Sequence, residues 1–125
     1  MLQYVTLQQA KDHLRVDHDS EDNDITLKIV AASAAVKGYL KSSSPYEPMR
    51  DSNDTPLLDS NDIPILDEDS SGNPIVRWEV RAAVLMLLGI FYRDRDGQEM
   101  KDWAHGYLPA PITALLYPLR DPAIA

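Results

Sequence analysis

Hydrophobic residues along this chain recur mostly at helical spacing, and the longest apolar run lies between Ala82 and Tyr92. No residue of that run is charged, and at 3.6 residues per turn it is apolar on every side of about three helical turns. We expect this helix to extend over Asn73–Arg93, with Asn73 as N-cap and Pro74 at the first helical position. Such a helix must be covered by other helices or by further copies of itself.

Two amphipathic patterns precede this apolar run. Thr6 and Gln9 have the spacing of a capping box, which predicts a short helix after Thr6. A polar link follows, in which Asp19 or Ser20 is expected to cap a longer helix that ends near Lys41. Hydrophobic spacing predicts that the buried stripe of this second helix consists of Ile25, Ile29, Ala32, Val36, Tyr39 and Leu40.

Residues 42–72 break the helical pattern, being rich in Ser, Asp, Asn and Pro. The segment DSNDTPLL at 51–58 is followed directly by DSNDIPIL at 59–66, and Asp67 is expected to begin a degraded third copy. Apolar pairs on either side of Asp59–Asp62 predict a hairpin whose prolines confine it to edge strands. The alternative is a segment that stays disordered in the isolated subunit. A loop of about 30 residues is unusual, and suggests a functional or mobile segment.

These elements predict an all-α protein, a small bundle of about four helices with the long acidic loop between the second and third. The fourth helix is expected to begin at Pro111 and to be closed by Pro118. At 125 residues the chain is expected to form a single domain, 1–125, with a flexible loop at 42–72.

The charge distribution singles out the same loop. The net charge is −8, and seven carboxylates without any Lys or Arg lie in residues 51–69: Asp51, Asp54, Asp59, Asp62, Asp67, Glu68 and Asp69. Direct binding of nucleic-acid phosphates requires clustered Lys and Arg side chains, so we do not expect it. The N-terminus has no secretory pattern, and the apolar run is shorter than the roughly 20 residues that span a bilayer. We expect a soluble, intracellular protein that does not contact membranes.

Candidate chemistry is sparse. The Asp and Asn residues of the repeat resemble calcium ligands, but the glycine and the twelfth-position glutamate of an EF-hand are missing. His13 and His18 are five residues apart, so they do not form an i, i+4 metal pair. His105 lies near Asp102 without any nucleophile motif. We therefore expect no enzyme, no cofactor and no metal, and keep a calcium- or protein-binding module built on the DSND repeats as the alternative function.

Aromatic and cationic residues around the apolar helix are the candidates for contacts between subunits. Tryptophan, tyrosine and arginine supply most interface hot spots. The candidate interface residues are Trp78, Arg81, Tyr92, Arg93, Arg95, Trp103 and Tyr107.

Three segments in this order resemble the phage head–tail connector (adaptor) family. The first is the opening helix ending His13–Arg15, followed by the acidic link and the Ala-rich helix ending Gly38–Tyr39. The second is the apolar helix, VRAAVLMLLGIFYRDRD, with its ending of Phe91, Tyr92 and Arg95. The third is LPAPITALLYPLR near the C-terminus, matched at Leu108, Pro109, Leu115, Leu116, Pro118 and Arg120. The DSND loop is longer and more acidic than the family leads us to expect.

The resemblance implies a structural subunit in the neck of the virion. Such proteins form a ring of about twelve copies beneath the portal, extend the DNA channel and present a surface to the next neck or tail protein. The partners implied are therefore further copies of the chain, the portal protein and that next protein, with DNA passing through without specific binding. The carboxylates of the loop would then either line the channel and repel the DNA backbone, or face outward on a docking arm for the portal or tail partner.

Overall fold

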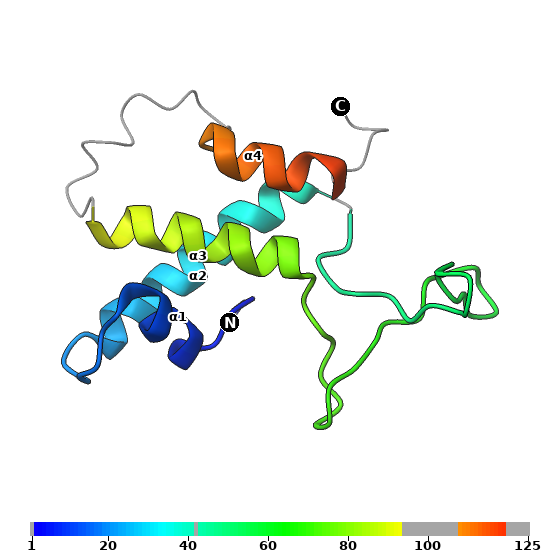
Figure 1. The fold of residues 1–125 in the computed structure, drawn as a ribbon, viewed down its shortest axis with the longest axis horizontal. Helices are drawn as coiled ribbons and strands as arrows, with labels where there is room; N and C mark the ends of the chain where they lie inside the picture. The colour runs from blue at the N-terminus through cyan, green and yellow to red at the C-terminus, as the bar shows by residue number, and fades with distance from the viewer. Residues whose placement is uncertain (1, 42, 94–107, 120–125) are drawn as a thin grey trace.

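The computed structural model describes residues 2–41, 43–93 and 108–119. Within these residues the chain forms a small all-α bundle without a strand, which confirms the predicted fold class. The bundle (Figure 1) consists of α1 (Leu7–Leu14), α2 (Asp22–Leu40), α3 (Trp78–Arg93), α4 (Ala110–Leu116) and a terminal 3₁₀ turn η2 (Tyr117–Leu119).

The first helix begins as its sequence predicts. The Thr6 hydroxyl accepts a hydrogen bond from the Gln9 amide, and the Gln9 side chain accepts one from the Thr6 amide. This reciprocal pair satisfies two amides that the helix leaves without partners. The predicted cap of α2 is wrong: α2 follows Glu21 without a side-chain cap, because Asp19 binds Lys11 and Ser20 binds His18 instead.

The core lies where α2 and α3 pack against each other. All six residues of the predicted α2 stripe are buried, and they meet Val80, Ala83, Val84, Leu87 and Leu88 of α3 in one cluster. The α3 helix also contacts α1 and α4, as a helix without a polar face requires. The buried Ser33 hydroxyl accepts a hydrogen bond from the Tyr4 amide, which ties the N-terminal segment to α2.

The start of α3 differs from the prediction. The helix begins at Trp78, and Asn73 is not its N-cap. The Asn73 amide donates to the Asp69 carboxylate, and the Asn73 carbonyl accepts from the Asp69 amide. The local aspartate turn therefore outcompetes helix initiation, since its side chain offers the backbone an alternative set of hydrogen bonds.

The end of α4 also shows a small difference. The α-helix ends at Leu116, and Pro118 lies inside the following 3₁₀ turn η2. A proline is tolerated there because its missing N–H falls at the end of the regular ladder. Buried Ile112 and Leu116 attach α4 to the core.

Residues 43–77, hereafter the arm, leave the bundle between α2 and α3 and project away from it (Figure 1). Pro48 is the only buried residue of the arm, all of which the structure describes. The arm is therefore held together by something other than a hydrophobic core.

Candidate functional site: an acidic arm and an apolar groove

Three turns of the arm share one geometry, and each begins with an aspartate. Asp51, Asp59 and Asp69 each accept two backbone N–H bonds on Oδ1, from the residues two and four positions further on, at 2.8–3.1 Å. The amide of each aspartate also donates to the carbonyl of the residue four positions on. We call residues 51–55, 59–63 and 69–73 the aspartate turns. They are the reason why aspartate recurs at these positions.

The fourth residue of every aspartate turn has a positive φ angle. The angle is 62° at Asp54, 61° at Asp62 and 82° at Gly72. Asp and Gly are among the residues that tolerate this left-handed conformation. The third copy of the repeat therefore begins at Asp69, as DSSGNPIV, and the prediction that it begins at Asp67 is wrong. Asp67 and Glu68 form a two-residue insertion that hides the period.

Two closed rings of backbone hydrogen bonds hold the arm together. In the outer ring Leu57 donates to Met49, Ile65 to Leu57, and Met49 to Ile65, at 2.8–2.9 Å. In the inner ring Glu47 donates to Ile75, Ile75 to Asp67, and Asp67 to Glu47, at 2.7–3.1 Å. Each ring joins three passes of the chain, so that every member both donates and accepts.

Proline residues of the arm occupy positions where no N–H is needed. Pro48, Pro56, Pro64 and Pro74 each face a residue of a neighbouring pass in an isolated antiparallel bridge. The hydrogen bonds of these pairs are made by the residues on either side. The pairing of Leu58 with Pro64 confirms the hairpin across Asp59–Asp62. What the prediction missed is that a third pass closes the hairpin into a ring.

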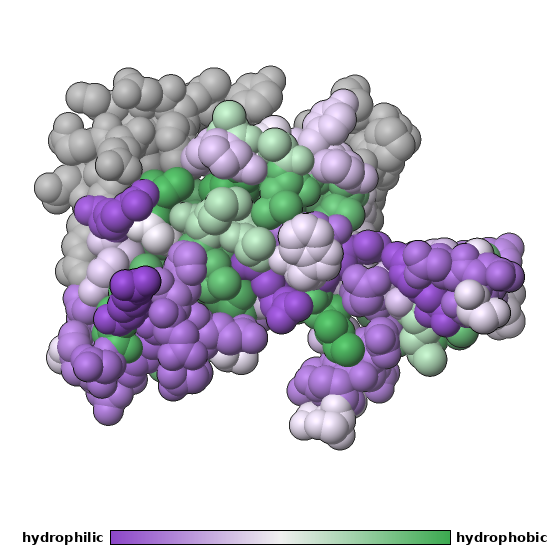
Figure 2. Space-filling model, viewed as in Figure 1, coloured by the Kyte–Doolittle hydropathy of each residue, from purple (hydrophilic) through white to green (hydrophobic). Residues whose placement is uncertain are grey.

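The surface of the arm combines carboxylates with large apolar side chains. Met49, Leu57, Leu58, Ile63 and Ile65 are all exposed, with 57% of Ile63 accessible. The predicted loop carboxylates lie among them and are exposed, except for the half-buried Asp67. Figure 2 shows the arm as a largely hydrophilic projection with apolar residues on its surface. Isolated apolar residues are normal on a surface, whereas five in one small segment indicate an interaction site.

No group of three or more His, Cys, Asp or Glu side chains within the described parts of the chain is placed to hold a metal ion. The first aspartate of each turn is already engaged by backbone amides. The calcium-binding alternative therefore gains no support from the geometry of the repeat.

A groove opens at the opposite end of α3. It has a volume of about 280 Å³ and an apolar lining that includes Met86, Ile90, Pro109 and Ile112. His13 of α1 and Arg93 of α3 supply the polar part of the lining. Arg93 is exposed and forms no ion pair with any described residue. We call this site the α3–α4 groove.

The remaining predicted interface residues are spread around α3. Trp78 is 60% exposed where the arm joins the helix. One turn further on, Arg81 lines a second cavity, of about 420 Å³, between the third aspartate turn and the N-terminal segment. The Arg81 Nε has no hydrogen-bond acceptor in the described part of the chain. At the other end, the Tyr92 hydroxyl donates to Glu21 at 2.5 Å and so ties α3 to the start of α2. Arg95, Trp103 and Tyr107, like Asp102 and His105, lie outside the described residues.

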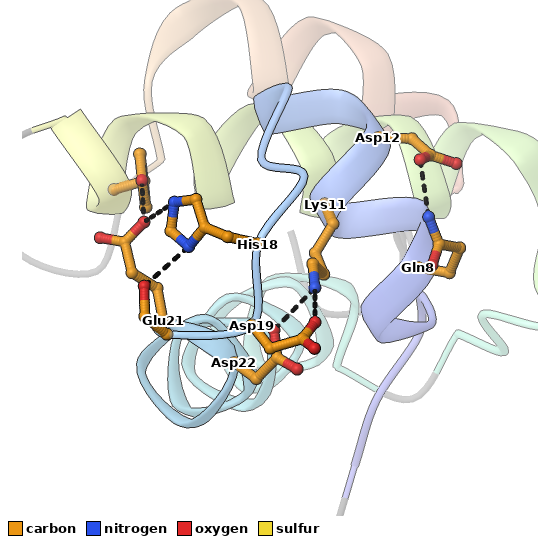
Figure 3. A network of polar contacts seen from close by, with 9 residues as sticks. Gln8, Lys11, Asp12, His18, Asp19, Glu21 and Asp22 are labelled. Atoms are coloured by element: carbon orange, nitrogen blue, oxygen red, sulfur yellow. Dashed lines mark hydrogen bonds and ion pairs between the residues drawn. The ribbon is translucent and has the colours of Figure 1, made fainter.

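A polar cluster joins α1 to the start of α2 (Figure 3). Lys11 Nζ lies 2.8 Å from Asp19 Oδ1 and 2.9 Å from Asp22 Oδ1. The hydrogen bonds to Asp19 and Asp22 raise the pKa of Lys11, and the bond from Lys11 lowers the pKa of Asp19. His18 Nδ1 lies 2.7 Å from the Ser20 hydroxyl.

Sequence reasoning missed the apolar side of the arm and the groove. The signal for the first was present, since Leu57 and Ile65 occupy the same position of the eight-residue repeat. The groove had no comparable signal, because it unites residues of α1, α3 and α4 with their flanking prolines. Only the packing of the bundle brings those residues together.

Comparison with known families gives a match over most of the chain. Residues 4–120 match the sequence model described as phage gp6-like head-tail connector protein. The match spans both the helical bundle and the arm. Comparison with curated proteins and with solved structures gives no significant match. Among the described residues, no helix is both long enough and apolar enough to cross a membrane.

Proposed function

Because the chain belongs to the phage gp6-like head-tail connector protein family, we propose that it is a structural subunit of a connector ring that joins the portal to the tail and extends the DNA channel. The family is a family of structural phage proteins and not of enzymes. The match over residues 4–120 is the observation that carries this proposal. In the proposed role, the chain works without a catalytic site or cofactor.

The helical bundle supports the proposal because it leaves apolar surface uncovered. Several apolar residues of α3, among them Leu85, Met86 and Ile90, are only partly buried. Trp78 and the α2 residue Leu27 are largely exposed. Large exposed apolar groups of this kind mark surfaces that other subunits cover.

In the proposed assembly about twelve copies close into a ring. The ring contacts the portal on one side and the next neck or tail protein on the other, and forms in the host cytoplasm before it becomes the neck of the virion. Trp78, Arg81, Tyr92 and Arg93 are the interface candidates among the described residues. Arg95, Trp103 and Tyr107 remain candidates beyond them.

The arm has two possible positions in such a ring. If it faced the channel, its carboxylates would form a negative collar that repels the DNA backbone and lets DNA slide. If it faced outward, it would be a docking arm. The exposed apolar side chains of the arm favour docking, because electrostatic repulsion of phosphates requires only the carboxylates. These side chains are Met49, Leu57, Leu58, Ile63 and Ile65.

Removal of the gene from a phage or prophage that carries it tests the proposed function. We expect filled heads and complete tails that remain separate, as seen by electron microscopy of the lysate. Purified protein added to that lysate should restore joined particles and infectivity. Joined, infectious particles in the absence of the protein would overturn the proposal.

A further inference from the structure

We infer that the tip of the arm of one subunit binds in the α3–α4 groove of a neighbouring copy of the same chain. The arm tip consists of residues 51–63, which include the first two aspartate turns, and Ile63 is the side chain that enters the groove. This inference deepens the proposed function, on which it rests, because it assigns the contact that links one subunit of the ring to the next.

The arm tip has the properties of a ligand and not of a folded core. Ile63 and Leu58 are more than half exposed, and no residue between 49 and 65 is buried. The outer ring of hydrogen bonds nevertheless fixes the backbone in one shape. Binding therefore costs less conformational entropy than the ordering of a flexible loop would.

The α3–α4 groove offers the complementary chemistry. Its lining is mostly apolar, which suits an aliphatic side chain, and its volume of about 280 Å³ leaves room for one. Its polar members, Arg93 and His13, carry no negative charge. On the arm, Asp62 precedes Ile63 in sequence, and Asp59 belongs to the same aspartate turn as Ile63 and accepts a hydrogen bond from its amide. An apolar side chain with carboxylates beside it therefore meets an apolar site beside an arginine that has no ion-pair partner among the described residues.

The two surfaces lie at opposite ends of the subunit. The arm joins α3 at Trp78, and the groove is lined by the second half of the helix, from Met86 to Arg93, which lies about 12 to 22 Å further along the helix axis. Figure 1 shows the arm pointing away from the end of α3 that approaches the start of α4. The tip therefore does not reach the groove of its own chain, and a second copy is the occupant that matches.

A contact between two different surfaces of identical subunits is heterologous. Each copy then offers one arm and accepts one arm, so the contact propagates from subunit to subunit and closes into a ring when the rotation permits. A two-fold dimer, which uses the same patch twice, would not produce this arrangement.

Disulfide trapping tests the contact directly, because the chain contains no cysteine. We would prepare I63C and M86C as separate proteins, mix them at about 1 mM each, where a contact with a Kd of about 1 mM involves roughly 40% of the molecules, and oxidise. We expect a covalent dimer in the mixture, no dimer of either variant alone beyond the background, and a ladder of higher species from the I63C/M86C double variant.

The matched control replaces I63C by L27C. Leu27 is at least as exposed as Ile63 but lies on α2, away from the arm. Dimer yield from I63C with M86C should exceed the yield from L27C with M86C by at least tenfold. Equal yields from the two mixtures would overturn the inference.

A charge substitution tests the electrostatic part of the same contact, with I63C and M86C as the cysteine pair. Adding R93E to the M86C protein should lower the trapped yield severalfold, whereas the matched K37E change on α2 should leave it unaltered. If R93E and K37E had the same effect, the electrostatic part of the inference would be wrong.

The outcomes separate the inference from the proposed function. Subunits that join heads to tails but give no trapped dimer would overturn the arm–groove contact and leave the connector function standing. Trapped dimers together with normal head–tail joining in the absence of the protein would overturn the connector function and leave the arm–groove contact standing.

Discussion

The helical bundle and the arm are parts of one chain that are stabilised in different ways. The bundle buries Leu87, Ile29 and their neighbours completely, and its helices are fixed by that burial. The arm buries only Pro48, and its shape comes from two rings of backbone hydrogen bonds and three carboxylate-capped turns. The comparison shows that a segment can have a defined conformation and still leave its apolar side chains available to a partner.

The largest effect is expected in the bundle. Leu87→Ala removes a fully buried side chain of α3 and should lower the free energy of unfolding by about 2–5 kcal/mol. Leu58→Ala, on the arm and 52% exposed, should change it by no more than about 0.5 kcal/mol. Urea denaturation followed by circular dichroism measures both. Equal losses would show that the arm is part of the cooperative core.

A smaller effect is expected where α3 is tied to the start of α2. Tyr92→Phe removes the hydrogen bond from the tyrosine hydroxyl to Glu21 and should cost about 1–3 kcal/mol, because the acceptor is a carboxylate in a partly buried site. The same denaturation measurement reports the loss. Tyr117→Phe, at an exposed position of η2, is the control and should leave stability unchanged.

In the arm, the expected effect is local. Asp59→Ala removes the acceptor for the Asn61 and Ile63 amides, so hydrogen exchange at these two amides should accelerate at least tenfold. The free energy of unfolding of the bundle should stay within about 0.5 kcal/mol of its original value. Exchange measured by NMR separates the two effects. Protection of amides in α3 should be unaltered, and a loss there would contradict the independence of the two regions.

The smallest effect concerns pH. The folded-state pKa of Asp19 is lowered by Lys11, so the contribution of Asp19 to stability is complete above the ordinary aspartate pKa and is lost as the pH falls through the lowered value. Lys11→Met should therefore make the decline in stability below about pH 4 shallower. Denaturation midpoints at a series of pH values provide the measurement. If stability declined equally steeply below about pH 4 in Lys11→Met, the Lys11–Asp19 pair would not contribute to the pH dependence of stability.

The sequence was sufficient for the bundle because helical burial follows a local spacing rule. The α2 stripe and the Thr6 capping box were both predicted residue by residue. The prediction of where α3 starts was wrong, because Asn followed by Pro is favoured both at the start of a helix and at the end of an aspartate turn. In this chain Asn73 ends the third aspartate turn, and α3 starts at Trp78. The arrangement of the arm was beyond a local rule, because Met49 meets Ile65 only after two turns have closed, and Glu47 meets Ile75 only after all three have closed.

The eight-residue period of the arm has a consequence for its evolution. Each unit carries its own capping aspartate, its own left-handed position and its own proline, so a unit brings everything that it needs to turn the chain. Replication slippage over such a tandem stretch would add or delete whole units without altering a helix. The length of the arm can thus change in steps of one unit while the helical scaffold that carries it is inherited intact.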